Sequence, residues 1–391
     1  MISGWKFKLI KACILIQVFW LALMKYKSPG KTRQAIRGLL RTRDEFLDKH
    51  KRNKYAYIQG KWWLGFSIPG WPSKAFNRFI LHFFHTLENP ADVDLTTLIF
   101  AITKKCGFQC EHCLEWNNLN KPETLTREDL LNIVNRFHEM GVSLVQFSGG
   151  EPINRLRDLL YVMKNGPKDI EYWMYSNGYA LNKEKIILLK QSGLTGIAIS
   201  IDHYNEKAHD QFRGVPGSFK HAVESARLCR EYKIAVTLSI CVTHDMASET
   251  NLMKYAALAK ENGVQFIQLL EPKAVGHYAG KNVGLNTEEL NILESFFLDL
   301  NFKSTFKDFP IVMYHGFYSR RIGCLGGGKD YVYVDTNGYV HSCPFCQSPL
   351  YNVLGSDFHK NLLTHKQQGC KMYPEIFNPV KKLETQSILS P

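Results

Sequence analysis

Residues 93–272 alternate short apolar segments with amphipathic ones, and this alternation limits the possible folds more than any other feature of the sequence. Each apolar segment is followed by a stretch with helical periodicity. The predicted strands are Leu95–Thr103, Leu144–Phe147, Ile170–Tyr175, Gly196–Ile201, Ile234–Val242 and Phe266–Leu270. Repeated strand–helix units predict a parallel sheet with right-handed crossovers. Since a full eight-unit barrel needs ~250 residues, we expect an α/β fold that is a partial (β/α)6 TIM-like barrel.

Polar residues gather where the predicted strands end. A cysteine-rich stretch follows the first strand, and the run Gly149-Gly150-Glu151-Pro152 follows the second. Further along come Ser176 and Asn177 after the third strand, and Ser200 and Asp202 at the fourth. Because chemistry in such folds is found at the carboxyl ends of the strands, these groups predict one shared site.

The cysteine-rich stretch contains Cys106, Cys110 and Cys113 within eight residues, with His112 between the last two. Each thiolate can bind one iron of a 4Fe–4S cluster. Three cysteines then leave one iron for a small chelating molecule. The alternative is a zinc knuckle, but structural zinc requires four closed ligands. Glu111 and His112 lie too close in sequence to complete that set easily.

The cysteine spacing, with Gly149-Gly150-Glu151-Pro152 after the next strand, resembles the signature of the radical S-adenosylmethionine (SAM) enzymes. His112 fills the position where that family has an aromatic residue. The resemblance covers residues 95–272. It implies that Cys106, Cys110 and Cys113 hold a SAM-binding 4Fe–4S cluster and that the Gly-Gly-Glu-Pro run lines the methionine amine.

The same resemblance assigns further cofactor contacts. Ser176 and Asn177 are similar to family residues near the ribose and the methionine carboxylate, and Ser200 and Asp202 to a polar pair on the fourth strand. Arg213 lies in a His-Asp-x-x-Arg-Gly segment, where it could pair with the SAM carboxylate. Ordinary strand-end turns and a surface salt bridge are the alternative interpretations.

The resemblance implies an oxygen-sensitive oxidoreductase. A one-electron donor such as a flavodoxin or ferredoxin would reduce the cluster, and cleavage of SAM would give a 5′-deoxyadenosyl radical that abstracts hydrogen from the substrate. A peptide or small molecule is the expected substrate, to be oxidised or cross-linked. The sequence identifies no catalytic side chain and no specific substrate. The non-enzyme alternative is a zinc-binding α/β protein.

Four more cysteines lie near the C-terminus: Cys324, Cys343, Cys346 and Cys370. They suffice for a second cluster, although zinc would also suit them. The spacing from Cys324 through Gly338 to Cys343 resembles the SPASM and twitch extensions, which implies an auxiliary 4Fe–4S cluster. Tyr331–Asp335 and Tyr339–Ser342 predict a hairpin that brings Cys324 and Cys343 together. Cys370 departs from both family patterns.

The positive charge lies at the N-terminus. Residues 1–90 contain 17 Lys and Arg against 4 Asp and Glu, and the remainder contains 32 of each. A neutral body argues against a nucleic-acid partner.

Ala12–Met24 is an apolar run between lysines, and it is short for a membrane span. We expect residues 1–30 to contact an anionic membrane surface, which would also admit a lipid or lipid-linked substrate. The alternatives are a helix packed on the body, a span, or a secretion signal.

The expected domains are residues 1–30, 31–92, 93–272, 273–375 and 376–391, of which 31–92 is basic, aromatic and helical. Helices are predicted over Thr32–Lys54 and Lys74–Leu87, and the aromatic stripe of the second predicts a core contact or a lid.

Seven of the ten cysteines lie in two groups. Grouped cysteines predict metal ligands in a reducing compartment, hence a cytoplasmic protein, peripheral at the membrane if residues 1–30 bind lipid.

Overall fold

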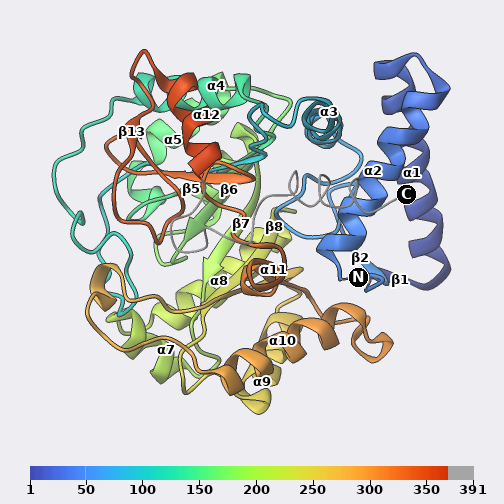
Figure 1. The fold of residues 1–391 in the computed structure, drawn as a ribbon. Coiled ribbons are helices and arrows are strands. Elements are labelled where there is room, and N and C mark those ends of the chain that lie inside the picture. Colours follow the sequence, from blue (N-terminus) through green and yellow to red (C-terminus); the bar gives the residue numbers. More distant parts are fainter. Residues whose placement is uncertain (49, 369–391) are drawn as a thin grey trace.

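The computed structural model describes residues 1–48 and 50–368. Its centre is a ten-stranded sheet with the order β10-β9-β8-β7-β6-β5-β4-β11-β12-β13 (Figure 1). The strands of this sheet are β4 (Thr97–Ala101), β5 (Leu144–Ser148), β6 (Glu171–Ser176), β7 (Leu194–Ser200), β8 (Ala235–Cys241), β9 (Phe266–Leu270), β10 (Ile311–Tyr314), β11 (Tyr331–Val334), β12 (Tyr339–His341) and β13 (Tyr351–Asn352).

The predicted fold class is confirmed. Strands β4 to β9 are the six predicted ones, and each pairs in parallel with the next. The sheet does not close, so the barrel is partial. Two parallel pairings were not predicted: β10 pairs with β9, and β11, which was predicted only as a hairpin strand, pairs with β4. Strands β12 and β13 continue from β11 in antiparallel fashion, so residues 331–352 share the sheet of the core.

Helices between the strands cover the outer face of the sheet and bury its main core. They are α4 (Arg127–Glu139), α5 (Leu156–Asn165), α6 (Lys183–Ser192), α7 (Glu206–Arg213), α8 (Ser218–Glu231) and α9 (Glu249–Glu261). A capping box begins α4: Asp129 N donates to Thr126 Oγ1 at 3.1 Å, and Thr126 N donates to Asp129 Oδ2 at 2.9 Å. Two amide groups at the helix start are thereby satisfied.

The C-terminal third adds α10 (Thr287–Phe302), α11 (His315–Ile322) and α12 (Phe358–Gln368). The predicted hairpin is confirmed, since β11 and β12 pair around Gly338, which has a φ of 81°. Helix α12 packs on α4, with Phe358 and Phe137 ring centroids 5.1 Å apart. The extension therefore contacts the core through a helix as well as through the sheet.

Helices α1 (Gly4–Tyr26), α2 (Pro29–Phe46) and α3 (Lys74–Glu88) stand beside the sheet rather than on its outer face (Figure 1). Helix α1 is longer than the apolar run suggested, because the flanking lysines are helical, and its 23 residues and composition would allow it to cross a membrane. The prediction that a helix extends to Lys54 is wrong: α2 ends at Phe46 and a strand begins at Lys54. The prediction for α3 is confirmed, and Ser73 Oγ caps it by accepting from Phe76 N at 3.0 Å.

The aromatic stripe of α3 is core. Phe76, Ile80 and Phe84 are buried against α1 and α2, where they form a small separate cluster with Val18 and Ala22. A lid over a substrate channel would need these side chains to face open space. The core interpretation of the stripe is therefore the correct one.

A three-stranded sheet of β1 (Ile2–Ser3), β2 (Lys54–Ile58) and β3 (Lys61–Trp63) closes one end of the open barrel. Trp63 and Phe66 pack against Trp173 at 5.7 and 5.5 Å, and Phe266 joins them. Trp173 and Phe266 lie near the amino ends of β6 and β9, on the face opposite the main core. We call this small sheet, with Trp63 and Phe66, the plug. It lies at the amino ends of the core strands and leaves their carboxyl ends available for the site.

Glu171 connects this plug to β6. Its Oε1 accepts from Lys61 Nζ at 3.0 Å and from Gly70 N at 3.3 Å, and the side chain is almost fully buried. Burial raises the pKa of Glu171 to about 7, although the Lys61 charge opposes the shift. Between about pH 4.5 and 7, the Glu171 carboxyl is therefore protonated in the folded state and ionised in the unfolded chain.

We expect the free energy of unfolding contributed by Glu171 to be highest below about pH 4.5 and to fall as the pH rises to about 7, by roughly 3 kcal/mol at most. The variant Glu171→Gln keeps the acceptor oxygen but cannot ionise. Its stability relative to the wild type should therefore increase from about pH 5 to about pH 8 in urea denaturation. A difference that is constant over this range would contradict the assignment.

Candidate active site

The three N-terminal cysteines lie on the loop that follows β4. Cys110 is buried, and Cys106 and Cys113 are partly exposed. Burial, together with a smaller effect of negative charge on Cys110, raises the pKa of Cys106 to about 11 and that of Cys113 to about 12. The three thiols are thus close enough to influence one another electrostatically. Their thiolate forms require a nearby positive charge, which iron ions supply.

The three cysteine side chains do not converge on a single point. Within residues 1–48 and 50–368, no three His, Cys, Asp or Glu side chains are gathered around one point as a mononuclear site requires. In a cubane cluster each thiolate binds a different iron, so the sulfurs need not converge on a point. A zinc knuckle would need four ligands that converge on one ion, so the cluster stays the better interpretation of this loop.

Two neighbours hold the loop in shape, and sequence reasoning missed both. Asn120 Oδ1 accepts from Cys106 N at 3.1 Å, and Asn120 Nδ2 donates to Cys106 O at 2.9 Å. His277 N donates to Cys113 O at 2.9 Å, its Nδ1 lies 3.0 Å from Cys110 O, and its ring stacks on Trp116 at 3.8 Å. Asn120 follows the cysteines closely, but nothing in the sequence indicates that His277 lies against them.

Gly149 and Gly150 bring the end of β5 against this loop. Gly150 N donates to Thr103 O and Glu151 N to Lys105 O, both at 2.7 Å. A Cβ on Gly149 would lie 2.5 Å from Thr103 O, and one on Gly150 would lie 2.5 Å from Lys105 O. Gly149 also has a φ of 128°, which residues with a side chain rarely adopt. The glycines thus allow two backbone segments to approach, and the predicted contact with the methionine amine stays a prediction.

Glu151 links the ends of β5 and β6. Its buried carboxylate accepts from Ser176 Oγ at 2.9 Å, from Asn177 N at 2.8 Å and from Ile153 N at 3.2 Å. Pro152 follows and begins a 3-10 turn, Pro152–Arg155. Burial raises the pKa of Glu151 even though these three donors favour the carboxylate. The structure therefore brings Glu151, Ser176 and Asn177 together, as the predicted site requires.

We expect Glu151→Gln to destabilise the protein by about 1–3 kcal/mol. Whichever way the new amide turns, its NH2 group faces a backbone N–H, of Asn177 or of Ile153, and leaves it without an acceptor. Thermal denaturation measures the effect, and Glu128→Gln, at an exposed position on α4, is the control that should leave the melting temperature unchanged. Equal melting temperatures for the two variants would show that the three hydrogen bonds do not depend on the carboxylate.

Arg213 and Asp202 form a buried ion pair beside the cysteines. Arg213 Nη2 lies 2.5 Å from Asp202 Oδ2, and Arg213 Nη1 lies 3.5 Å from Cys110 Sγ. Burial would raise the pKa of Asp202, but the Arg213 charge lowers it below its usual value. The Nε–H of Arg213 is buried and has no acceptor among the described residues. That group could donate to the carboxylate of a bound cofactor.

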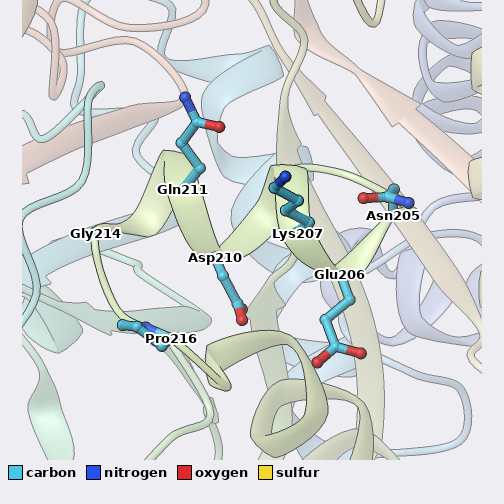
Figure 2. Close-up of a pocket in the computed structure, with 7 residues that line it drawn as sticks. All are labelled: Asn205, Glu206, Lys207, Asp210, Gln211, Gly214 and Pro216. Atoms are coloured by element: carbon cyan, nitrogen blue, oxygen red, sulfur yellow. The ribbon is translucent and has the colours of Figure 1, made fainter.

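The remaining predicted residues lie around this pair. His112 stacks on Phe212 at 5.0 Å, and Ser200 lies at the end of β7, opposite Ser239 of β8. A surface hollow beside α7 is lined by other residues, namely Asn205, Glu206, Lys207, Asp210, Gln211, Gly214 and Pro216 (Figure 2). Since none of the predicted cofactor contacts lines it, the hollow is not the predicted site.

The C-terminal cysteines form a second group. Cys343 Sγ and Cys346 Sγ lie 3.7 Å apart. Burial raises the pKa of Tyr331, and negative charge on Cys343, Cys324 and Cys346 raises it as well. All three cysteines thus lie near Tyr331, and their role as ligands of an auxiliary cluster stays a prediction. Cys370 lies outside the described residues. His341 is held between Asp335 and the Cys346 carbonyl, with Nε2 3.2 Å from Asp335 Oδ2.

Comparison with known proteins identifies the class. Residues 100–258 match the model of the radical SAM superfamily. The chain therefore carries a radical SAM domain and is a SAM-dependent enzyme that uses a 4Fe–4S cluster, as the cysteine spacing predicted.

Its relatives within this class differ in activity. An AdoMet-dependent heme synthase of Oleidesulfovibrio alaskensis is 24% identical over 67% of this chain and 72% of its own length. A GTP 3′,8-cyclase of Aliarcobacter butzleri is 27% identical over 53% of this chain and 64% of its own length. A heme synthase of Nitratidesulfovibrio vulgaris is matched over only 41% of its length.

Two solved structures share the fold. Streptococcus suis SuiB bound to its precursor peptide SuiA has a TM-score of 0.55, with 15% identity, over 77% of this chain and 69% of that one. The structure of anSMEcpe with bound AdoMet has a TM-score of 0.54, with 19% identity, over 73% of this chain and 86% of that one. At these identities the likeness extends to the fold alone.

Proposed function

We propose that this enzyme abstracts a hydrogen atom from a peptide or small molecule and thereby oxidises or cross-links it. The observation that carries the proposal is the junction at Gly150 and Glu151. There the strand end that would hold the methionine part of SAM is hydrogen-bonded to the loop of Cys106, Cys110 and Cys113. When bound, the reduced cluster and SAM supply the hydrogen-abstracting radical.

The chain's own residues would bind and orient the cofactor. The three thiolates would hold three irons, and the Nε–H of Arg213 would meet the SAM carboxylate while Asp202 balances the arginine charge. Gly149 and Gly150 would leave room for the methionine amine beside the loop. A flavodoxin or ferredoxin would supply the electron, in a reducing, cytoplasmic compartment.

A peptide substrate is supported by the structural neighbours, since SuiB was solved with its precursor peptide and anSMEcpe with bound peptides. An auxiliary 4Fe–4S cluster at Cys324, Cys343, Cys346 and Cys370 would complete the proposal. It could accept an electron from a substrate radical, which favours oxidation over reactions that return the hydrogen.

The test is anaerobic reconstitution with iron and sulfide, followed by reduction and addition of SAM. Formation of 5′-deoxyadenosine supports the proposed cleavage, and its absence from a reconstituted protein contradicts it. Deuterated candidate peptides are then added. Transfer of deuterium into 5′-deoxyadenosine identifies a substrate, and transfer from none of the peptides would direct the search to small molecules.

A second candidate substrate is a lipid or lipid-linked molecule. The observation in its favour is that α1 exposes apolar side chains to solvent, among them Trp5, Ile16 and Trp20. Deuterated lipid presented in vesicles should then transfer deuterium into 5′-deoxyadenosine. Failure of that transfer while the vesicles bind the protein would leave the peptide or small-molecule substrate as the better proposal.

A further inference from the structure

Helix α1 presents an apolar face to solvent. Of the fifteen large apolar side chains that are exposed among the described residues, eight lie in residues 1–24. Trp5, Ile16, Trp20 and Met24 are exposed by 70, 58, 56 and 72%. Soluble proteins rarely leave a contiguous apolar surface of this kind without a partner. The face is formed by Trp5, Leu9, Ile16, Phe19, Trp20 and Met24, and we call it the outer face.

The opposite face of α1 is fixed to the body along the whole helix. Phe7 stacks on Tyr55 at 4.6 Å near its start. At mid-helix, Gln17 Nε2 donates to Asn77 Oδ1 at 2.5 Å and Gln17 Oε1 accepts from Trp71 Nε1 at 2.8 Å. Near its end, Tyr26 donates to the Phe84 carbonyl. Because these contacts fix the rotation of the helix, the outer face stays exposed.

Positive charge surrounds the outer face. The first 43 residues contain no Asp or Glu. Lysines lie at both ends of α1: Lys6, Lys8 and Lys11 near its start, and Lys25 and Lys27 at its end. Helix α2, which runs beside α1 (Figure 1), adds Arg33 and Arg37. Its Arg41 and Arg43 pair with Glu45 and Asp44, and Lys25 of α1 pairs with Glu88, so these three contribute less. Apolar and aromatic side chains bordered by basic ones match the interface of an anionic bilayer.

We propose that the outer face of α1 lies in the surface of an anionic lipid membrane, with the helix axis parallel to the membrane plane. At about 34 Å, α1 is long enough to cross the hydrocarbon core. Crossing would, however, carry the arginines of α2 into lipid or break the contacts of Gln17 and Tyr26. When α1 lies parallel to the membrane surface, all these contacts persist, and the lysines at both ends of the helix reach the lipid headgroups. The proposal does not depend on the reaction that the enzyme catalyses.

Vesicle sedimentation of the full chain tests the surface. Binding is expected to phosphatidylcholine vesicles that contain phosphatidylserine and to weaken with added salt. The double variant Phe19→Ser, Trp20→Ser should bind roughly tenfold more weakly or worse, because it removes apolar area at the lipid contact. The matched control is Leu188→Ser, at an exposed leucine on α6, which should bind as the wild type does.

Both variants should keep the wild-type circular dichroism spectrum and SAM cleavage, so that a folding failure is recognised. For a folded double variant, binding equal to the control overturns the proposal. So does equal binding of the wild type to vesicles with and without phosphatidylserine, because the basic residues would then have no role. The first result would leave the outer face to a protein partner, and the second would mean that the lipid contact does not require anionic headgroups.

Lysine labelling tests the orientation. A membrane-impermeant amine reagent, added outside sealed vesicles that carry the protein, should modify Lys6 and Lys8 as well as Lys27 and Lys31, as peptide mass spectrometry will show. An in-plane helix leaves both ends on the outer side. Protection of one end alone would mean that α1 crosses the bilayer, and would overturn the proposed orientation.

Discussion

Replacing Cys110 with alanine is expected to abolish SAM cleavage. Cys110 is the central thiol of the loop, and its thiolate raises the pKa of both Cys106 and Cys113. Its loss removes one of three iron ligands, and it also leaves Arg213 Nη1 without the sulfur that lies 3.5 Å away. The reconstituted variant should contain about four fewer irons per chain and should form no 5′-deoxyadenosine above background.

Cys343→Ala is the matched control, because it removes a thiol from the second group. If that group holds an auxiliary cluster, this variant also loses about four irons per chain but still cleaves SAM. The two variants thus separate the functions of the two cysteine groups. Cleavage by Cys110→Ala at the wild-type rate, or equal loss of cleavage in both variants, would contradict the assignment.

Replacing Gly150 with alanine is expected to lower the rate of SAM cleavage by about a hundredfold, because a displacement of about 1 Å at a reacting centre has that effect. The new Cβ would lie 2.5 Å from Lys105 O and 2.8 Å from Lys105 C. These are backbone atoms of the cysteine loop and cannot rotate away. The loop must shift, at a cost of about 1–3 kcal/mol in stability. Single-turnover assays and thermal denaturation measure the two effects.

Gly107→Ala provides a sharp control within the same loop. A Cβ on Gly107 meets no atom within 4 Å, so this variant should melt and react like the wild type. The pair distinguishes a steric requirement at Gly150 from a general need for flexible glycines near the cysteines. Equal loss in both variants would favour the second explanation.

The sequence predicted those parts of the fold that local patterns encode. The six strands and the hairpin around Asn337-Gly338 depend on neighbours a few residues apart, and all are present. The parallel pairing of Tyr331–Val334 with Thr97–Ala101 joins segments more than two hundred residues apart, and no periodicity indicates it. For the same reason the plug formed by Trp63 and Phe66 could not be placed.

The site shows a similar division. Motif spacing identified the cysteines and Glu151, because these residue types are demanded by the chemistry. The supports at Asn120 and His277 were missed, since an asparagine or histidine in a loop carries no such signal. The glycine pair was predicted to lie beside the methionine amine, and what approaches it in the structure is the backbone at Thr103 and Lys105.

The pairing of β11 with β4 has a consequence for how this enzyme can evolve. The strand that leads into the first cysteine loop is flanked on one side by a strand of the C-terminal extension. Lys104 Nζ also donates to Asn337 Oδ1 of the extension at 2.8 Å. The extension is thus no detachable appendage, because losing it would expose the backbone of β4 as a bare sheet edge, open to association with other chains. The two cysteine groups are therefore expected to be gained, kept or lost together.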